Sequence, residues 1–142
     1  MSYSQSFPNA IITTVFIADK VQQNIFDFIP TKEISSALGI AAPTVTKILQ
    51  ALNNAGIIET REGAKGGVRL SMPYDQVTVL HIFDAIEHKK PPFQANYNIA
   101  ATGKRPDIAQ AIIKNLFEST DYKMRQELAS LRISDLIHKM DS

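Results

Sequence analysis

The order of elements expected within residues 30–72 constrains this chain more than any other feature. The apolar spacing over residues 32–38 predicts a short helix, which we expect the hydroxyl of Thr31 to cap. Gly39 ends this helix, because glycine adopts the left-handed backbone conformation at low cost. Pro43 opens a second helix. Proline has no N–H, but in the first turn of a helix this N–H would have no partner within the helix, so no hydrogen bond is lost. Two helices joined by a tight turn are therefore expected.

The second helix has one apolar face and one polar face, and a hairpin follows it. The apolar side chains recur at helical spacing: Val45, Ile48, Leu49 and Leu52. The outer face carries polar groups and a single charge: Thr44, Thr46, Lys47, Gln50, Asn53 and Asn54. Two short strands, 57–62 and 68–72, flank a glycine-rich turn. This order is that of a winged helix-turn-helix, whose second helix enters the DNA major groove.

The rest of the chain is mainly helical. Helices are expected over residues 9–21, 77–88 and 107–131, and a last short helix is expected to be capped by Ser134. The fold class is therefore mainly α with a small β-hairpin wing, followed by a long C-terminal dimerisation helix. We expect a DNA-binding domain over 1–88, a loop over 89–106, and the dimerisation helix with the short helix over 107–142.

Six side chains are candidates for DNA contact: Thr44, Thr46, Lys47, Gln50, Lys65 and Arg69. The first four lie on the early outward turns of the second helix, where glutamine and lysine suit purine edges and threonine suits thymine. Lys65 and Arg69, in and beside the wing, suit phosphate or minor-groove contact. Residues 31–72 hold five Lys and Arg against three Glu, a modest positive excess. A merely solvated helix face is the alternative.

Several function classes are excluded by what the sequence lacks. It has no cysteine, so disulfides, thiolate metal sites and a cysteine nucleophile are excluded. His81, His88 and His138 lack ligand spacing, and no triad order or carboxylate pair stands out. We therefore expect no metal, no cofactor and no enzyme. With 44% hydrophobic and 20% charged residues, no apolar run long enough for a bilayer and no basic export region, a cytoplasmic protein is expected.

Five segments resemble successive signatures of the Rrf-type winged helix-turn-helix transcription regulators, a group that includes the bacterial iron-sulfur cluster regulator. They are EISSALGI (33–40), ILQALNNAGI (48–57), GAKGG (63–67), VTVLHIFDAIE (77–87) and ISDLI (133–137). The resemblance implies a homodimeric regulator, which we expect to be a repressor on a palindromic operator. It also implies that the long helix packs against its partner's copy.

The chain departs from the family at its cluster loop, its recognition helix and its wing. Many members hold an iron-sulfur cluster with three cysteines in the loop before the long helix, and residues 89–106 contain none. Thr44 and Thr46 stand where the family often has an aromatic residue and an acid, so a different operator is expected. The wing begins Glu62-Gly63 instead of Arg-Gly. Either Arg61, Lys65 or Arg69 takes over that contact, or the wing contributes less.

Two questions stay open at the level of the sequence. The loop over 91–105, with Phe93 and Tyr97, either closes over an apolar small-molecule effector or only links its neighbours. In other proteins the winged fold also mediates protein–protein contacts. Because the positive excess here is modest, an interaction adaptor with little DNA binding remains the alternative function for this chain.

Overall fold

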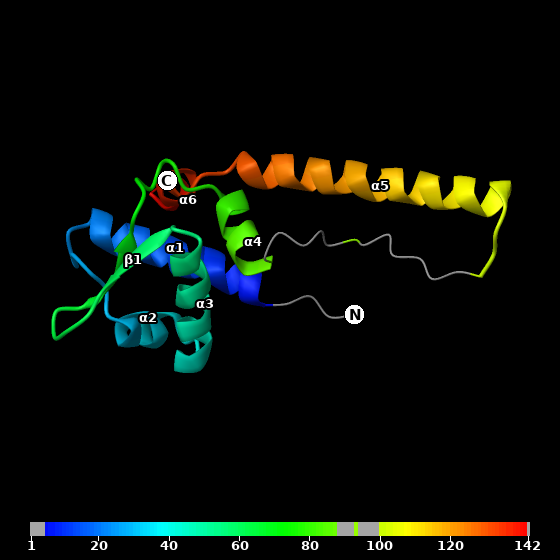
Figure 1. The fold of residues 1–142 in the computed structure, drawn as a ribbon. Helices are drawn as coiled ribbons and strands as arrows, with labels where there is room; N and C mark the ends of the chain where they lie inside the picture. Colours follow the sequence, from blue (N-terminus) through cyan, green and yellow to red (C-terminus); the bar gives the residue numbers. More distant parts are fainter. Residues whose placement is uncertain (1–4, 88–92, 94–99, 142) are drawn as a thin grey trace.

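The computed structural model describes residues 5–87, Phe93 and residues 100–141. In chain order the elements are α1 (Ser6–Gln22), α2 (Thr31–Leu38), α3 (Ala42–Asn54), β1 (Ile58–Arg61), β2 (Gly67–Leu70), α4 (Val79–Glu87), α5 (Lys104–Ala129) and α6 (Ile133–Met140). Figure 1 shows a helical body with the hairpin at one end and α5 extending from the other side. This arrangement confirms the expected mainly α fold with a β-hairpin wing and a long helix near the C-terminus.

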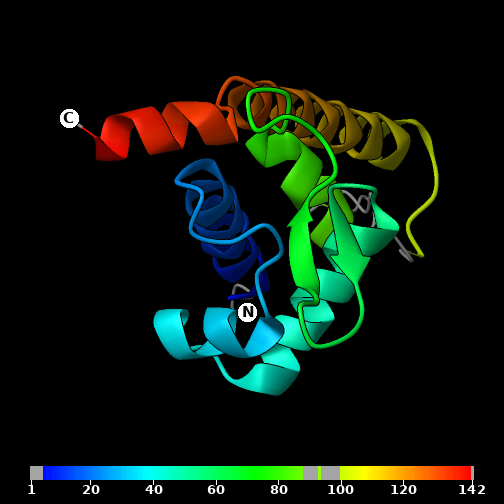
Figure 2. The same ribbon diagram turned by 90° about the vertical axis from the view of Figure 1, so that its left-hand side faces the viewer.

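Helix α1 runs through the middle of the body. It packs against α2, α3, α4, α6 and β2, and Figure 2 shows it between the α2–α3 pair and α6. Ala10 and Ile17 are fully buried along it. Thr14 is also buried, and its hydroxyl donates to the carbonyl of Ala10 at 2.7 Å, which satisfies that polar group inside the core. The helix-turn-helix is therefore supported from behind by one central helix.

The turn between α2 and α3 forms as the local signals predict, but the cap does not. Gly39 has φ 66°, and the Ser35 hydroxyl donates to the carbonyl of Ile40 at 2.6 Å across the turn. The expectation that Thr31 caps α2 is wrong. Thr31 is the first helical residue, and the backbone of Pro30 occupies the cap position, with no side-chain cap bond. The carbonyl of Pro30 accepts the first helical hydrogen bonds instead.

The wing is an antiparallel hairpin extended by a third segment. Strands β1 and β2 pair from Ile58 with Leu70 to Arg61 with Gly67. On the other edge of β2, Ile29 and Val68 exchange backbone hydrogen bonds of 2.8 and 2.9 Å. Gly67 has φ 148°, and a Cβ there would lie 2.2 Å from the Ile29 carbonyl oxygen. This close approach requires glycine.

The C-terminal segment is bonded to the start of α4. Val79 N–H donates to the Leu131 carbonyl and Ile133 N–H donates to the Val77 carbonyl, at 2.9 and 2.8 Å. This bridge is why α4 begins at Val79 and not at 77 as expected. The expected Ser134 cap of α6 is also wrong. Ser134 is buried within the first turn, and the Asp135 carboxylate accepts from the Arg132 N–H at 2.9 Å, which caps α6 from inside.

Helix α5 begins at Lys104, earlier than the expected residue 107, because a proline in the first turn, here Pro106, costs no hydrogen bond. None of its residues is buried. Its N-terminal half leaves the body, and its free end points away from the hairpin (Figure 1). Within the described ranges, no helix combines the length and apolar character that a membrane span requires.

Candidate nucleic-acid interface

The outer face of α3 presents three of the predicted contact residues to solvent. Thr46, Lys47 and Gln50 are exposed, whereas Thr44 at the helix start is half-buried. The Thr46 hydroxyl donates to the Ala42 carbonyl at 3.0 Å, which leaves its methyl group and a lone pair outward. Within residues 5–87 and 100–141, the side chains of Lys47 and Gln50 make no hydrogen bond or ion pair. Both are therefore available to a ligand.

A groove of about 420 Å³ lies between this helix and the wing. Its polar lining comes from α2, α3 and β1: Thr31, Thr46, Gln50, Asn53, Asn54 and Thr60. Amide and hydroxyl groups both donate and accept hydrogen bonds, as base edges require. The structure therefore brings Thr46 and Gln50 together beside the wing.

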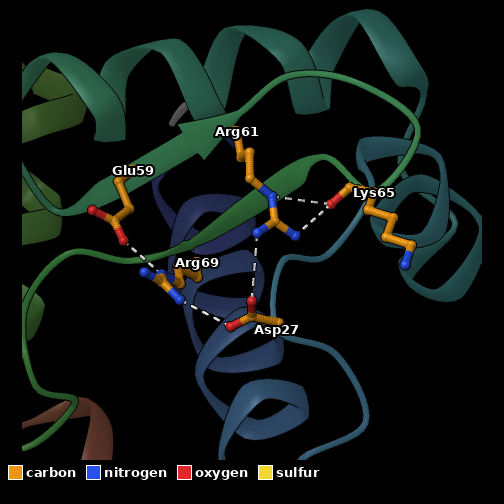
Figure 3. A network of polar contacts seen from close by, with 5 residues as sticks. All are labelled: Asp27, Glu59, Arg61, Lys65 and Arg69. Carbon is orange, nitrogen blue, oxygen red and sulfur yellow. Dashed lines mark hydrogen bonds and ion pairs between the residues drawn. The ribbon is translucent and has the colours of Figure 1, made fainter.

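The two wing arginines, Arg61 and Arg69, form ion pairs with carboxylates of the same chain (Figure 3). Arg69 donates from Nε to Glu59 at 2.5 Å and from one terminal nitrogen to Asp27 at 2.9 Å. Arg61 donates to the Lys65 carbonyl at 3.3 and 2.7 Å and lies 3.6 Å from the other Asp27 oxygen. One aspartate thus joins both arginines, and Arg61 also holds the turn of the wing.

The two guanidinium groups share one aromatic ring. Their central carbons lie 4.1 Å (Arg61) and 4.2 Å (Arg69) from the centroid of Phe28, a distance at which a cation is attracted to the ring face. The hydrogen bond with Glu59 is the main cause that raises the pKa of Arg69 above its usual value. The ion pairs with Asp27 and Glu59 therefore neutralise both arginines locally.

The unpaired positive charge near this face belongs to lysines. In the described part of the chain, the ammonium groups of Lys32, Lys47 and Lys65 have no hydrogen bond or ion pair. Lys65 is exposed at the wing tip, and Figure 3 shows its side chain pointing away from the arginine pair. Of the two wing residues predicted to contact DNA, Lys65 is free and Arg69 is not.

Asp27 and Phe28 were missed by the sequence reasoning. They lie before α2, and nothing in their spacing connects them with a hairpin some forty residues later. The bridge between Ile29 and Val68 brings them to the wing. The sequence signal for this contact is the apolar stretch over residues 25–29, whose side chains suit a short strand.

The loop that was considered for an effector lies mostly outside the described residues, and Tyr97 is among those omitted. Phe93 is described, and its ring stacks on that of Phe117 with centroids 5.4 Å apart.

The chain matches the Rrf2 family, described as "Iron-dependent Transcriptional regulator", over residues 3–139. It is 40% identical to "Protein aau3" of Rhizobium meliloti over 55 residues, which cover 39% of this chain and 36% of that protein. It is 25% identical to the HTH-type transcriptional regulator IscR of Cereibacter sphaeroides over 111 residues, 78% of this chain and 71% of that protein. The chain thus spans little more than a third of the first relative's length.

A solved structure has the same fold. The structure of IscR from T. potens superposes with a TM-score of 0.72, covering 99% of this chain and 88% of that one, at 15% sequence identity. At this identity the likeness concerns the fold alone.

The family description names iron, and the donors of this chain do not fit an iron-sulfur cluster. The sequence has no cysteine, and residues 89–106 also contain no histidine, aspartate or glutamate. Within residues 5–87 and 100–141 no three such side chains gather at metal-binding distance. The residues of this chain therefore offer no ligand set for such a cluster.

Proposed function

Because the chain belongs to the Rrf2 family of transcriptional regulators, which are not enzymes, we propose that it is a homodimeric repressor that binds a palindromic operator without an iron-sulfur cluster. In this proposal residues 1–88 form the DNA-binding domain and residues 107–142 the dimerisation part, joined by residues 89–106. A dimer seated on an operator excludes other proteins from the same DNA, which is the simplest form of repression.

One observation carries the DNA-binding proposal: the outer face of α3 holds the exposed side chains of Lys47 and Gln50, which have no partner within residues 5–87 and 100–141. This face lies next to a wing whose Lys65 ammonium is likewise unpaired there. Gln50 suits the paired donor and acceptor of an adenine edge, and Lys47 suits the acceptors of guanine. Thr46 offers its methyl group to thymine, and Thr44 reaches the DNA from the helix start. These four are the proposed base-reading residues.

The wing supplies sequence-independent contacts in this proposal. Lys65 neutralises a phosphate or enters the minor groove. Arg69 contacts a phosphate that competes with the Glu59 and Asp27 carboxylates for its N–H donors. Because phosphates carry no sequence information, these contacts add affinity and position α3 without selecting the operator.

An apolar stripe on α5 supports the homodimer. Ile108, Ile112 and Leu116 follow one another at intervals of four residues and are 49%, 62% and 59% exposed. Side chains four residues apart share one face of a helix. A second copy of α5 packed on this face would remove the stripe from water, as an isologous two-fold interface does. The two copies of α3 would then read half-sites about 34 Å apart.

Selection of bound fragments from genomic DNA, followed by footprinting, tests the proposal. We expect an inverted repeat with half-sites about one helical turn apart, occupied by two chains. Retention of no duplex at low salt would contradict it. Capture of a protein partner without DNA would then favour the interaction adaptor.

A further inference from the structure

We infer that Asp27 and Glu59 are internal counter-ions of the wing. They pair with the guanidinium groups of Arg61 and Arg69, which would otherwise pair with DNA phosphates, and so reduce the contribution of the wing to DNA affinity. The inference rests on the proposed binding of DNA. It assigns a role in the strength of binding to two acidic residues that are not among the proposed DNA contacts.

The topology places the four charges on one face of the wing. Arg69 is paired with Glu59 across the hairpin, and Arg61 lies two residues further along β1, on the same face as Glu59. Asp27 bridges both arginines from the neighbouring segment. The two positive and two negative groups sum to zero, so an approaching phosphate meets a neutral cluster.

Carboxylate and phosphate are interchangeable partners for this site. A guanidinium presents a planar fork of N–H donors that pairs with either anion through the same hydrogen bonds. The ring of Phe28 supports both guanidiniums from one side, which keeps them together when their partners change. DNA therefore has to displace carboxylates whose hydrogen bonds resemble those of a phosphate. The binding free energy of each new arginine–phosphate contact is reduced by the loss of an arginine–carboxylate contact.

The four charged side chains are exposed to solvent, so a phosphate can replace a carboxylate as the partner of an arginine. The side chains of Asp27 and Glu59 are 67% and 47% exposed, and those of Arg61 and Arg69 are 45% and 38% exposed. Ion pairs this open to water stabilise a fold only slightly, since solvent screens them. Removing the carboxylates should therefore leave the body folded while it frees the arginines.

Binding of the Asp27→Asn, Glu59→Gln double variant, compared with the parent chain, tests the inference. We expect it to bind both the selected operator and a random duplex about three- to tenfold more tightly at low salt, because each freed arginine gains a phosphate partner. The dependence of log affinity on log salt should steepen by about one to two, one counterion per arginine. Thermal unfolding checks that both proteins are folded.

A matched control removes two negative charges away from the wing. The control is the Asp75→Asn, Asp141→Asn double variant, which changes the net charge by as much as the Asp27→Asn, Glu59→Gln variant does. Both positions are exposed, and their side chains have no partner among the described residues. We expect it to leave affinity within about twofold of the parent, because exposed charges beyond a Debye length are screened. Equal tightening by this control would overturn the inference in favour of a general charge effect.

A double-mutant cycle isolates the contact itself. Glu59→Gln should tighten binding in the parent chain and have no effect in an Arg69→Gln background. Weaker or unchanged binding by the Asp27→Asn, Glu59→Gln variant, with the parent chain binding normally, would overturn only the counter-ion role. Failure of parent and variant alike to retain any duplex would overturn the proposed function and the inference with it.

Discussion

Arg125 on α5 donates hydrogen bonds from both terminal guanidinium nitrogens to the two carboxylate oxygens of Asp84 on α4, at 2.9 and 2.8 Å. This bidentate pair joins the long helix to the body, and its hydrogen bonds are the main cause that raises the pKa of Arg125. No residue of α5 is buried, and this pair is one of the contacts that join the helix to α4.

Replacing Arg125 with Ala should lower the free energy of unfolding by about 1 kcal/mol, because the pair is bidentate and partly shielded from water. Urea denaturation measures this loss. Lys114→Ala is the control: Lys114 and Glu118 form a single ion pair within α5, at 4.0 Å and largely exposed, which does not connect the helix to the body. It should change stability by less than about 0.5 kcal/mol, and equal losses would contradict the docking role.

Replacing Ile112 with Glu should convert the dimer into a monomer, because it places a charge in the middle of the apolar stripe of α5. Sedimentation velocity at micromolar concentration measures the change, and operator affinity should fall with it. The monomer should stay folded, since Ile112 is 62% exposed in the single chain. Ile112→Leu should remain dimeric. A parent chain that sediments as a monomer would remove the dimer proposal.

Replacing Gln50 or Lys47 with Ala should cost about 1–3 kcal/mol of operator binding and relax the preference at one base pair. Competition binding against operators with single base changes measures both effects. Lys65→Ala should instead weaken binding to every duplex alike and reduce the salt slope by about one. If all three variants lose specific and random DNA equally, Gln50 and Lys47 are not base readers.

Replacing Gly67 with Ala should destabilise the wing by about 2 kcal/mol or more, because the new methyl group meets the Ile29 carbonyl and the backbone is strained. Gly63→Ala provides a matched control at the same hairpin. Its φ is 101°, but nothing lies within 4 Å of a Cβ there, so its cost should be about 1 kcal/mol. Thermal unfolding and DNA affinity together measure the effect; equal costs would show that the contact with Ile29 is unimportant.

Signals that act within one helical turn predicted the helix-turn-helix well. Gly39 ends α2 and Pro43 lies in the first turn of α3, because each effect depends on the backbone of a few neighbouring residues. Caps were predicted less well. Thr31 and Ser134 have suitable hydroxyls, but the chain entering each helix comes from a strand-like bridge. The helix start is shifted by one residue at α2 and by two at α6.

The sequence by itself determined the order of the elements, the polar face of α3 and the absence of cysteine ligands, since these depend on local spacing or on composition. Only the tertiary structure decided which positive charges are free. Asp27 and Arg69 are 42 residues apart, and Asp84 and Arg125 are 41 apart. Ion pairs form between groups that the fold brings within a few ångströms, and no local spacing encodes that distance. Among the residues that the structure describes, the pairing of Ile29 with Val68 therefore leaves Lys65, and not Arg69, as a wing cation without an ion pair.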